Sequence, residues 1–277
     1  MGFELGALLG NIGDGAQSFE SLGSWDITSL GTNTFDVSND DSGFQHSSDL
    51  SGFISVDSGQ NGLVTYNYAT SNDVYNRWWF DVSAHNIVSY LWTINASNTA
   101  TESGNLVFFA NSESNPISIS TDYQRHRIQV FANDTDDYRV ALELNAANSK
   151  YQYYIDDLLT AIDVIDLFPE WSTQLKDELF LVDHQTIGGA NPSYKWGFNK
   201  KWDLPLTHVE ENEALLLNQW WQDTRPLLFT FDTSDTTQQF IVTMTNNKTP
   251  MNQFSRIYHD EWQGTLELSA LSTGLSF

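Results

Sequence analysis

The sequence has no cysteine and few basic residues. Twelve lysines and arginines stand against 36 aspartates and glutamates among its 277 residues, which gives a formal net charge of −24 at pH 7. Without cysteine, the chain can form neither a disulfide framework nor a thiolate metal site. The negative field repels phosphate backbones and anionic headgroups, so we expect no nucleic-acid partner and no binding to membrane surfaces.

The sequence also lacks a long apolar segment and an export signal. No stretch approaches the roughly 20 apolar residues of a transmembrane helix. Residues 1–15 have neither the basic start nor the apolar core of a signal peptide. We therefore expect a protein that is synthesised in a cytoplasm and does not insert into a membrane.

The motifs of common hydrolases and nucleotide-binding enzymes are missing as well. There is no Gly-x-Ser-x-Gly elbow and no phosphate-binding loop, and the six histidines do not have the spacing of zinc ligands. These absences predict a non-enzymatic protein. A glycosidase stays open as an alternative, because it needs only two carboxylates in a cleft and 36 acidic residues always offer a pair.

The chain does contain ample material for a folded core. Apolar residues make up 40% of it and aromatic residues 14%, with ten tryptophans, which excludes a disordered chain. A chain of 277 residues is long enough for two cores. A change of pattern after residue 165 predicts one unit at 1–165 and another at 166–277.

In the first unit, short alternating runs are separated by Asn, Asp, Ser and Gly. This pattern is typical of an antiparallel β-sandwich. The predicted strands with the strongest pattern are 77–82, 87–94, 105–110, 126–131, 138–144 and 151–155.

In the second unit, the pattern predicts a small sheet covered by one helix, an α+β arrangement. Residues 163–181 read as a short linker or an amphipathic helix after Pro169. Leu216 and Trp220 recur at helical spacing, so we expect both to pack on the sheet. The expected elements after the linker are a hairpin at 194–209, a helix at 210–223 and strands at 227–231, 239–245 and 262–268.

Two landmarks near the ends of the first unit carry a family resemblance. They are Phe19-Glu20-Ser21-Leu22-Gly23-Ser24-Trp25 and Tyr153-Tyr154-Ile155-Asp156-Asp157-Leu158. Together they resemble the opening and closing strands of jelly-roll carbohydrate-binding modules, although Ser21-Leu22 adds one residue to the usual spacing. The resemblance spans about residues 11–165 and implies a jelly-roll β-sandwich.

The same resemblance implies a structural calcium ion between the first and last strands. Glu20 and Asp156 would be its side-chain ligands and Asp14 a third candidate, with backbone carbonyls completing an oxygen shell. The alternative is that Asp156-Asp157 simply ends a strand in solvent.

Sugar binding would need flat aromatic faces that stack on pyranose rings. Trp79, Tyr90, Trp92 and Tyr123 are the candidates. The alternative for each is that it fills the core of the sandwich.

A second resemblance covers about residues 178–277. It rests on Trp202-Asp203-Leu204-Pro205-Leu206, Leu217-Asn218-Gln219-Trp220-Trp221, 245–250 and 258–268. These segments resemble a minor tail or tail-tip module of long-tailed phages, in which a helix-backed sheet packs into a ring. Neighbouring residues on a helix point about 100° apart, so Trp220 and Trp221 cannot both face one sheet. Either one of them is an interface residue, or both are buried between the two units.

The leading hypothesis is therefore a phage virion structural protein, a minor tail, tail-tip or baseplate component located in the tail. Residues 178–277 would anchor it to other tail proteins in a ring homo-oligomer. Residues 11–165 would project outward and bind cell-surface glycans in host adhesion. The alternatives are a free bacterial carbohydrate-binding or adhesin protein and an accessory module of a polysaccharide-degrading enzyme.

Overall fold

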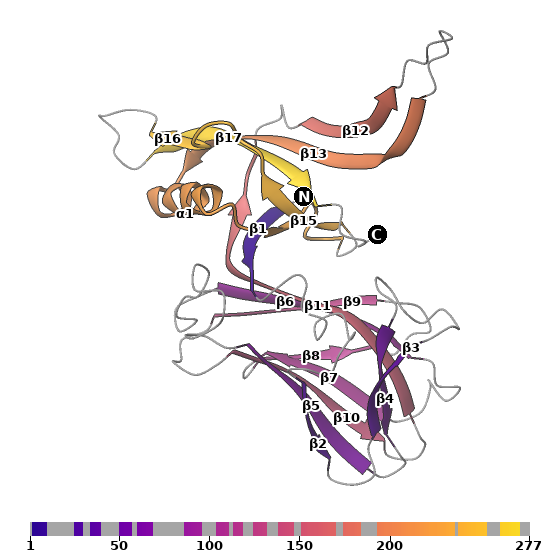
Figure 1. Ribbon diagram of the computed structural model, residues 1–277. Helices are drawn as coiled ribbons and strands as arrows, with labels where there is room; N and C mark the ends of the chain where they lie inside the picture. Colours follow the sequence, from indigo (N-terminus) through magenta and orange to yellow (C-terminus); the bar gives the residue numbers. More distant parts are fainter. Residues whose placement is uncertain are drawn as a thin grey trace. The chain divides into compact units, whose positions relative to one another are not determined.

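The chain folds into two compact units (Figure 1). The sandwich comprises Leu8–Val164 together with Gly274–Phe277, and the C-terminal unit comprises Met1–Ala7 and Ile165–Thr273. The computed structural model describes residues 2–9, 25–29, 34–39, 50–56, 60–68, 86–95, 104–110, 113–118, 124–131, 138–146, 151–169, 174–183, 193–235, 238–253 and 261–271.

Two antiparallel sheets form the sandwich. The first has the order β3 (Thr34–Asn39), β4 (Leu50–Val56), β11 (Tyr151–Leu167), β6 (Asn86–Asn95), β9 (Gln124–Phe131). The second has the order β2 (Trp25–Ser29), β5 (Gln60–Tyr68), β10 (Tyr138–Ala146), β7 (Gly104–Ala110), β8 (Glu113–Ile117). The predicted fold class, mainly β with an antiparallel sandwich and a small α+β unit, is confirmed. The strand predicted at residues 77–82 lies outside the described residues.

Apolar residues of both sheets form the core of the sandwich, and along β7 and β10 buried and less buried residues alternate. Phe108 and Leu142 are opposite each other on β7 and β10, and both are fully buried. On the other sheet Ile87 is paired with Val130 and Ile162, and these are buried too. Burial of apolar area stabilises the fold by about 25 cal/mol per Å², so each of these buried pairs contributes to the stability of the sandwich.

The sheet of the C-terminal unit has the order β12 (Gln174–Asp183), β13 (Ser193–Val209), β17 (Trp262–Ala270), β15 (Gln239–Met244), β14 (Leu227–Thr230), β1 (Phe3–Leu8), and β16 (Met251–Gln253) also pairs with β17. The assignment of residues 1–7 to the first unit was wrong. Glu4–Ala7 pair with β14 in the C-terminal unit, and this contact joins residues more than 200 positions apart, which no local pattern can reveal.

Two predicted elements in this region were also wrong. Residues 174–183 form strand β12 instead of a linker or helix, and residues 194–209 lie within the single strand β13 instead of a hairpin. Leu175 and Leu179 are four residues apart, a spacing that places them on one face of a helix and equally on one face of a strand. The pairing with β13 decides in favour of the strand.

An aromatic cluster and one helix form the core of the C-terminal unit. The ring centroid of Trp202 lies 5.1 Å from that of Phe229 and 4.8 Å from that of Phe240. Helix α1 (Glu211–Gln222) buries Ala214, Leu217 and Trp220. Trp220 is buried as predicted, but its fully buried partner is Leu217, whereas Leu216 is only half-buried. Leu217 and Leu216 differ by 100° around the helix, and spacing alone did not fix the rotation.

Acidic residues occupy the start of α1. Glu211 and Glu213 lie in its first turn, where the helix dipole favours negative charge. Partial burial, together with the nearby carboxylates of Glu210 and Asp166, nevertheless raises the pKa of Glu213, while a hydrogen bond from the backbone of Glu210 opposes this shift. The N-terminus of the helix is therefore crowded with negative charge.

Candidate functional site

One sheet of the sandwich presents a mixed apolar and charged surface. Along β10, Val140 and Leu142 are fully buried, whereas Arg139 and Glu143 are exposed and Ala141 is half-buried. Along β7, Leu106, Phe108 and Ala110 are buried and the residues between them are half-buried. We call the less buried set the outer face: Leu63, Val107, Phe109, Arg139, Ala141 and Glu143.

The strand register sets the residues of the outer face side by side. Ala141 is opposite Phe109, and Glu143 is opposite both Val107 and Leu63. Side chains directly opposite each other on antiparallel strands have Cβ atoms about 4.5–5.5 Å apart. Leu63 is 38% exposed. The result is an apolar patch with a carboxylate within it and the guanidinium of Arg139 on the same strand.

This combination of side chains could contact a sugar. Aromatic and apolar faces cover the C–H side of a sugar ring, and charged groups hydrogen-bond to its hydroxyls. Phe109 was not among the residues predicted from the sequence, because Phe108 and Phe109 are adjacent and a pair of neighbouring phenylalanines does not reveal which one faces the core. The alternation of Arg139, Ala141 and Glu143 against Val140 and Leu142 was the available signal.

The aromatic candidates from the sequence are placed elsewhere or lie outside the described part. Trp79 and Tyr123 are outside the described residues. Tyr90 and Trp92 are on β6, in the other sheet of the sandwich, where the backbone of Trp92 is opposite Asp156 and Arg125. The strand order therefore puts neither of them on the sheet that carries the outer face.

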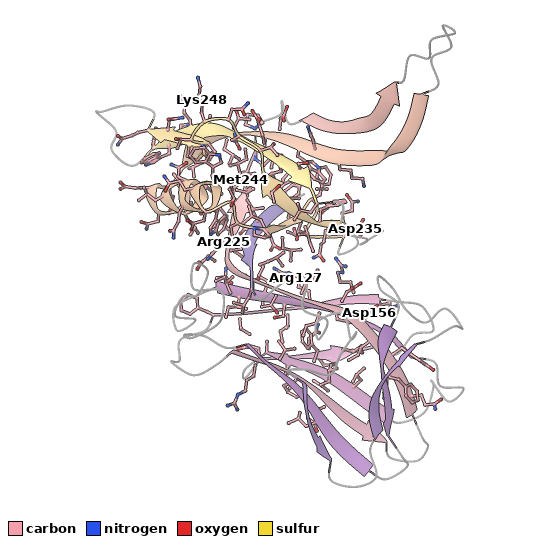
Figure 2. The ribbon with its side chains drawn as sticks, viewed as in Figure 1. Arg127, Asp156, Arg225, Asp235, Met244 and Lys248 are labelled. Carbon is pink, nitrogen blue, oxygen red and sulfur yellow. The ribbon has the colours of Figure 1, made fainter. Side chains whose placement is uncertain are left out.

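Asp156 is the one predicted calcium ligand that the structure describes, and it is fully buried on β11 (Figure 2). The backbone N–H of Asp157 donates to Oδ1 of Asp156 at 2.8 Å. Asp157 has a φ of 54°, and the register of β11 with β6 shifts just after Asp156. The alternative that Asp156-Asp157 ends a strand in solvent was wrong, because β11 continues to Leu167.

A buried carboxylate needs compensation, since removing a charge from water costs several kcal/mol. The N–H of Asp157 supplies part of it. The other two predicted calcium ligands, Glu20 and Asp14, lie outside the described residues. Within the described ranges, no group of three or more His, Asp or Glu side chains could hold a metal ion. The calcium site stays a prediction.

The two adjacent tryptophans of α1 have different environments. Trp220 is 1% exposed, so it is a core residue. Trp221 is half-buried, and its indole Nε1 donates to the backbone carbonyl of Asn246 at 2.8 Å. A role for Trp221 at an interface with another protein stays a prediction.

Two asparagines tie the helix and the segment after β15 to the sheet. The side chain of Asn218 donates to the carbonyl of Met251 at 3.1 Å and accepts its N–H at 3.0 Å. The side chain of Asn246 donates to the carbonyl of Thr265 at 2.7 Å and accepts the N–H of Glu267 at 3.0 Å. Each amide thus bonds to a strand as a neighbouring backbone would, which fixes the path of residues 245–251.

Comparison with solved structures finds distant likenesses. No family model and no curated protein matches the sequence. A structure of TmCBM61 in complex with β-1,4-galactotriose has a TM-score of 0.41 at 10% identity and covers 52% of this chain and 94% of that one. A family 11 carbohydrate-binding module from Clostridium thermocellum, in complex with a mixed-linked tetrasaccharide, has a TM-score of 0.35 at 11% identity, covering 58% and 96%.

A third likeness is to the enzymatically active domain of bacteriophage CBA120 tailspike protein 4. Its TM-score is 0.39 at 12% identity, and it covers 55% of this chain but only 21% of the tailspike chain. At these scores the likenesses carry no argument about this chain. The assignment of the sandwich fold therefore rests on the pairing of its strands.

No helix among the described residues is long and apolar enough to cross a membrane.

One titratable group of the sandwich gives it a predicted pH dependence. His126 on β9 is half-buried, and its Nε2 is enclosed without a hydrogen-bond partner in the part of the chain that the structure describes. Burial lowers the pKa of His126 from the ordinary 6.5. The unfolded chain therefore binds a proton at this histidine at a higher pH than the folded chain does.

We expect the sandwich to lose stability as the pH falls below about 6.5, the pKa of an unperturbed histidine. The stability that depends on neutral His126 is fully present above this value. Thermal unfolding of wild type and His126→Gln between pH 8 and pH 5 tests the prediction. The melting temperature of the wild type should fall more steeply than that of the variant. Parallel curves would show that His126 does not contribute.

Proposed function

We propose that the protein is a non-enzymatic, sugar-binding structural component of a phage tail, at the tail tip or baseplate. The sandwich binds cell-surface glycans through its outer face, and the C-terminal unit attaches it to other tail proteins. The observation that carries the glycan-binding role is the row of Phe109, Ala141 and their neighbours, which leaves apolar side chains partly exposed beside Glu143 and Arg139.

An open sheet surface suits weak binding of an extended sugar chain. The outer face carries two charged side chains, Arg139 and Glu143, as hydrogen-bonding groups, so we expect a single copy to bind weakly. Several copies on one tail would raise the overall strength of attachment, because binding of the first site brings the second to a high effective concentration. The net charge of −24 also keeps neighbouring copies soluble and apart before assembly.

Support for the anchoring role comes from the C-terminal unit. It is a compact body with its own core around Trp202, Phe229 and Trp220, and its residues 202–206 and 217–221 resemble a tail-tip module. A separate core lets one unit be held in an assembly while the other binds a ligand.

The glycan-binding proposal predicts a specific loss on mutation of the outer face. Phe109→Ala should weaken binding of full-length protein to a glycan found by array screening at least tenfold, because burying a phenylalanine side chain contributes about 1.5–3 kcal/mol. Isothermal titration calorimetry measures the change. Phe131→Ala is the matched control, since Phe131 is 67% exposed on β9 of the other sheet. Equal affinities for wild type and Phe109→Ala would refute the site.

The calcium proposal predicts that the sandwich melts at a higher temperature in calcium than in chelator. A ligand that binds only the folded state adds about 2.7 kcal/mol at a hundredfold excess over its Kd. Asp156→Asn should abolish this response, whereas Asp163→Asn, a half-buried position on the same strand, should keep it. Scanning calorimetry with calcium and with EDTA measures the two melting temperatures. A wild-type melting temperature that is the same in calcium and in EDTA would contradict the calcium site.

A further inference from the structure

Glu143 lies in the middle of the outer face, the surface to which we assign glycan binding. Its side chain is exposed. The residues directly opposite it are Leu63 on β5 and Val107 on β7, and Pro116 of β8 is opposite Val107 in turn. All three are apolar, so no basic residue is directly opposite the carboxylate on either neighbouring strand.

The basic residue of the outer face lies further along β10. Arg139 and Glu143 are four residues apart and share one face of the strand. At about 3.4 Å per residue, their Cα atoms are about 14 Å apart. Ala141 lies between them and is opposite Phe109. A sugar ring against Phe109 would therefore have Glu143 on one side and Arg139 on the other.

The sheet that carries the outer face is acidic. Its five strands contain one basic residue, Arg139, against three acidic residues, Asp26, Glu113 and Glu143, a net charge of −2. The whole chain carries −24. A field of this sign lowers the local concentration of anionic ligands and leaves that of neutral ligands unchanged. The charge of the sheet and the charge of the chain therefore act in the same direction.

We propose that Glu143 determines the class of glycan that the outer face accepts, namely chains without negative charge, whose hydroxyls donate to its carboxylate. The row of Leu63, Glu143 and Val107 adjoins the row of Ala141 and Phe109. A polymer with a carboxylate on every sugar cannot cross both rows without placing one of its charges beside Glu143. Specificity of this kind comes from a group that repels the wrong ligand as well as from contacts with the right one. This inference rests on the proposed glycan-binding function and does not depend on the anchoring role of the C-terminal unit.

The test compares oligosaccharides that differ only in charge. A glycan array carries neutral oligosaccharides, each beside its C6-oxidised form, in which a carboxylate replaces the CH2OH group of every sugar. Full-length wild type is compared with Glu143→Gln, which keeps the size of the side chain and a hydrogen-bond acceptor but removes the charge. Glu211→Gln is the matched control, because Glu211 is exposed on α1 in the C-terminal unit. Both variants have the same net charge, −24 plus 1, or −23.

We expect wild type to bind the neutral form of a glycan at least about fivefold more tightly than the oxidised form at low salt, the effect of one contact between like charges in water. This preference should become smaller as salt rises. Glu143→Gln should reduce the ratio of the two affinities by about the same factor, whereas Glu211→Gln should leave the ratio unchanged. Both substitutions are at exposed positions, so we expect both variants to fold.

Three results would overturn the proposal. They are a wild type that prefers the oxidised form, a ratio of affinities that is the same in wild type and Glu143→Gln, and equal effects of Glu143→Gln and Glu211→Gln. In each of these cases the protein still binds a glycan, so the proposed function stands. A wild type that binds neither form of any glycan is a different result, which would contradict the glycan-binding function itself and this inference with it.

Discussion

Replacing Trp220 with alanine is expected to lower the free energy of unfolding of the C-terminal unit by about 3–5 kcal/mol. The side chain is 1% exposed and lies on the buried face of α1 with Ala214 and Leu217. Its indole Nε1 has no hydrogen-bond partner in the described part of the chain. The loss therefore comes from packing and from the cavity that remains, and not from a broken hydrogen bond.

Denaturant unfolding followed by far-ultraviolet circular dichroism measures this loss. Leu215→Ala is the control, because Leu215 is 50% exposed on the same helix, and surface changes usually stay within about 0.5 kcal/mol. The loss of unfolding free energy in Trp220→Phe should lie between those of Trp220→Ala and Leu215→Ala, since phenylalanine keeps an aromatic ring in the core. A midpoint for Trp220→Ala equal to that of the wild type would show that the helix does not pack through this residue.

Gly264→Ala is expected to disrupt the pairing of β16 with β17. A Cβ atom at Gly264 would clash with the carbonyl oxygen of Pro250 and would lie 2.8 Å from its carbonyl carbon. Both are backbone atoms, so no side chain can rotate away, and Met251, the strand partner of Gly264, must move with them. We expect a loss of about 3 kcal/mol, at the upper end of the range for overpacking.

Gly2→Ala is the matched control for this clash. Its Cβ would approach the Oγ1 of Thr233 at 2.9 Å, and a hydroxyl at the end of a side chain can turn aside. The melting temperature of Gly264→Ala should therefore fall by several degrees more than that of Gly2→Ala. Similar values for the two variants would mean that the close approach at Pro250 relaxes without cost.

The sequence predicted those parts of the fold that depend on local alternation. Val140 and Leu142 alternate with the charged Arg139 and Glu143, which predicts a strand with one buried and one solvent-exposed face, and the structure contains this strand as β10. Leu175 and Leu179 fit a helix and a strand equally well, so the choice depended on their strand partners Trp202 and Phe198, which lie 27 and 19 residues further along the chain. The paired residues of β1 and β14 are separated by more than 200 positions along the sequence, which is further still.

The candidate site residues also divide into those that neighbouring residues reveal and those that depend on distant strand partners. Asp156 was predicted as a calcium ligand from a motif of neighbouring residues; the structure buries it fully, and its role as a ligand stays a prediction. Phe109 was not found, because its role depends on the register that places it beside Ala141. The rotation of α1, which buries Leu217 instead of Leu216, likewise depends on what the helix packs against.

Binding of a glycan by the outer face of the sandwich is tested best by a crystal structure of the full-length protein soaked with a glycan identified by array screening. We expect a sugar over β5, β10 and β7, with a ring against Phe109 and hydroxyls within hydrogen-bonding distance of Glu143 or Arg139. A sugar bound on the other sheet, or an array on which no glycan binds the protein, would contradict it.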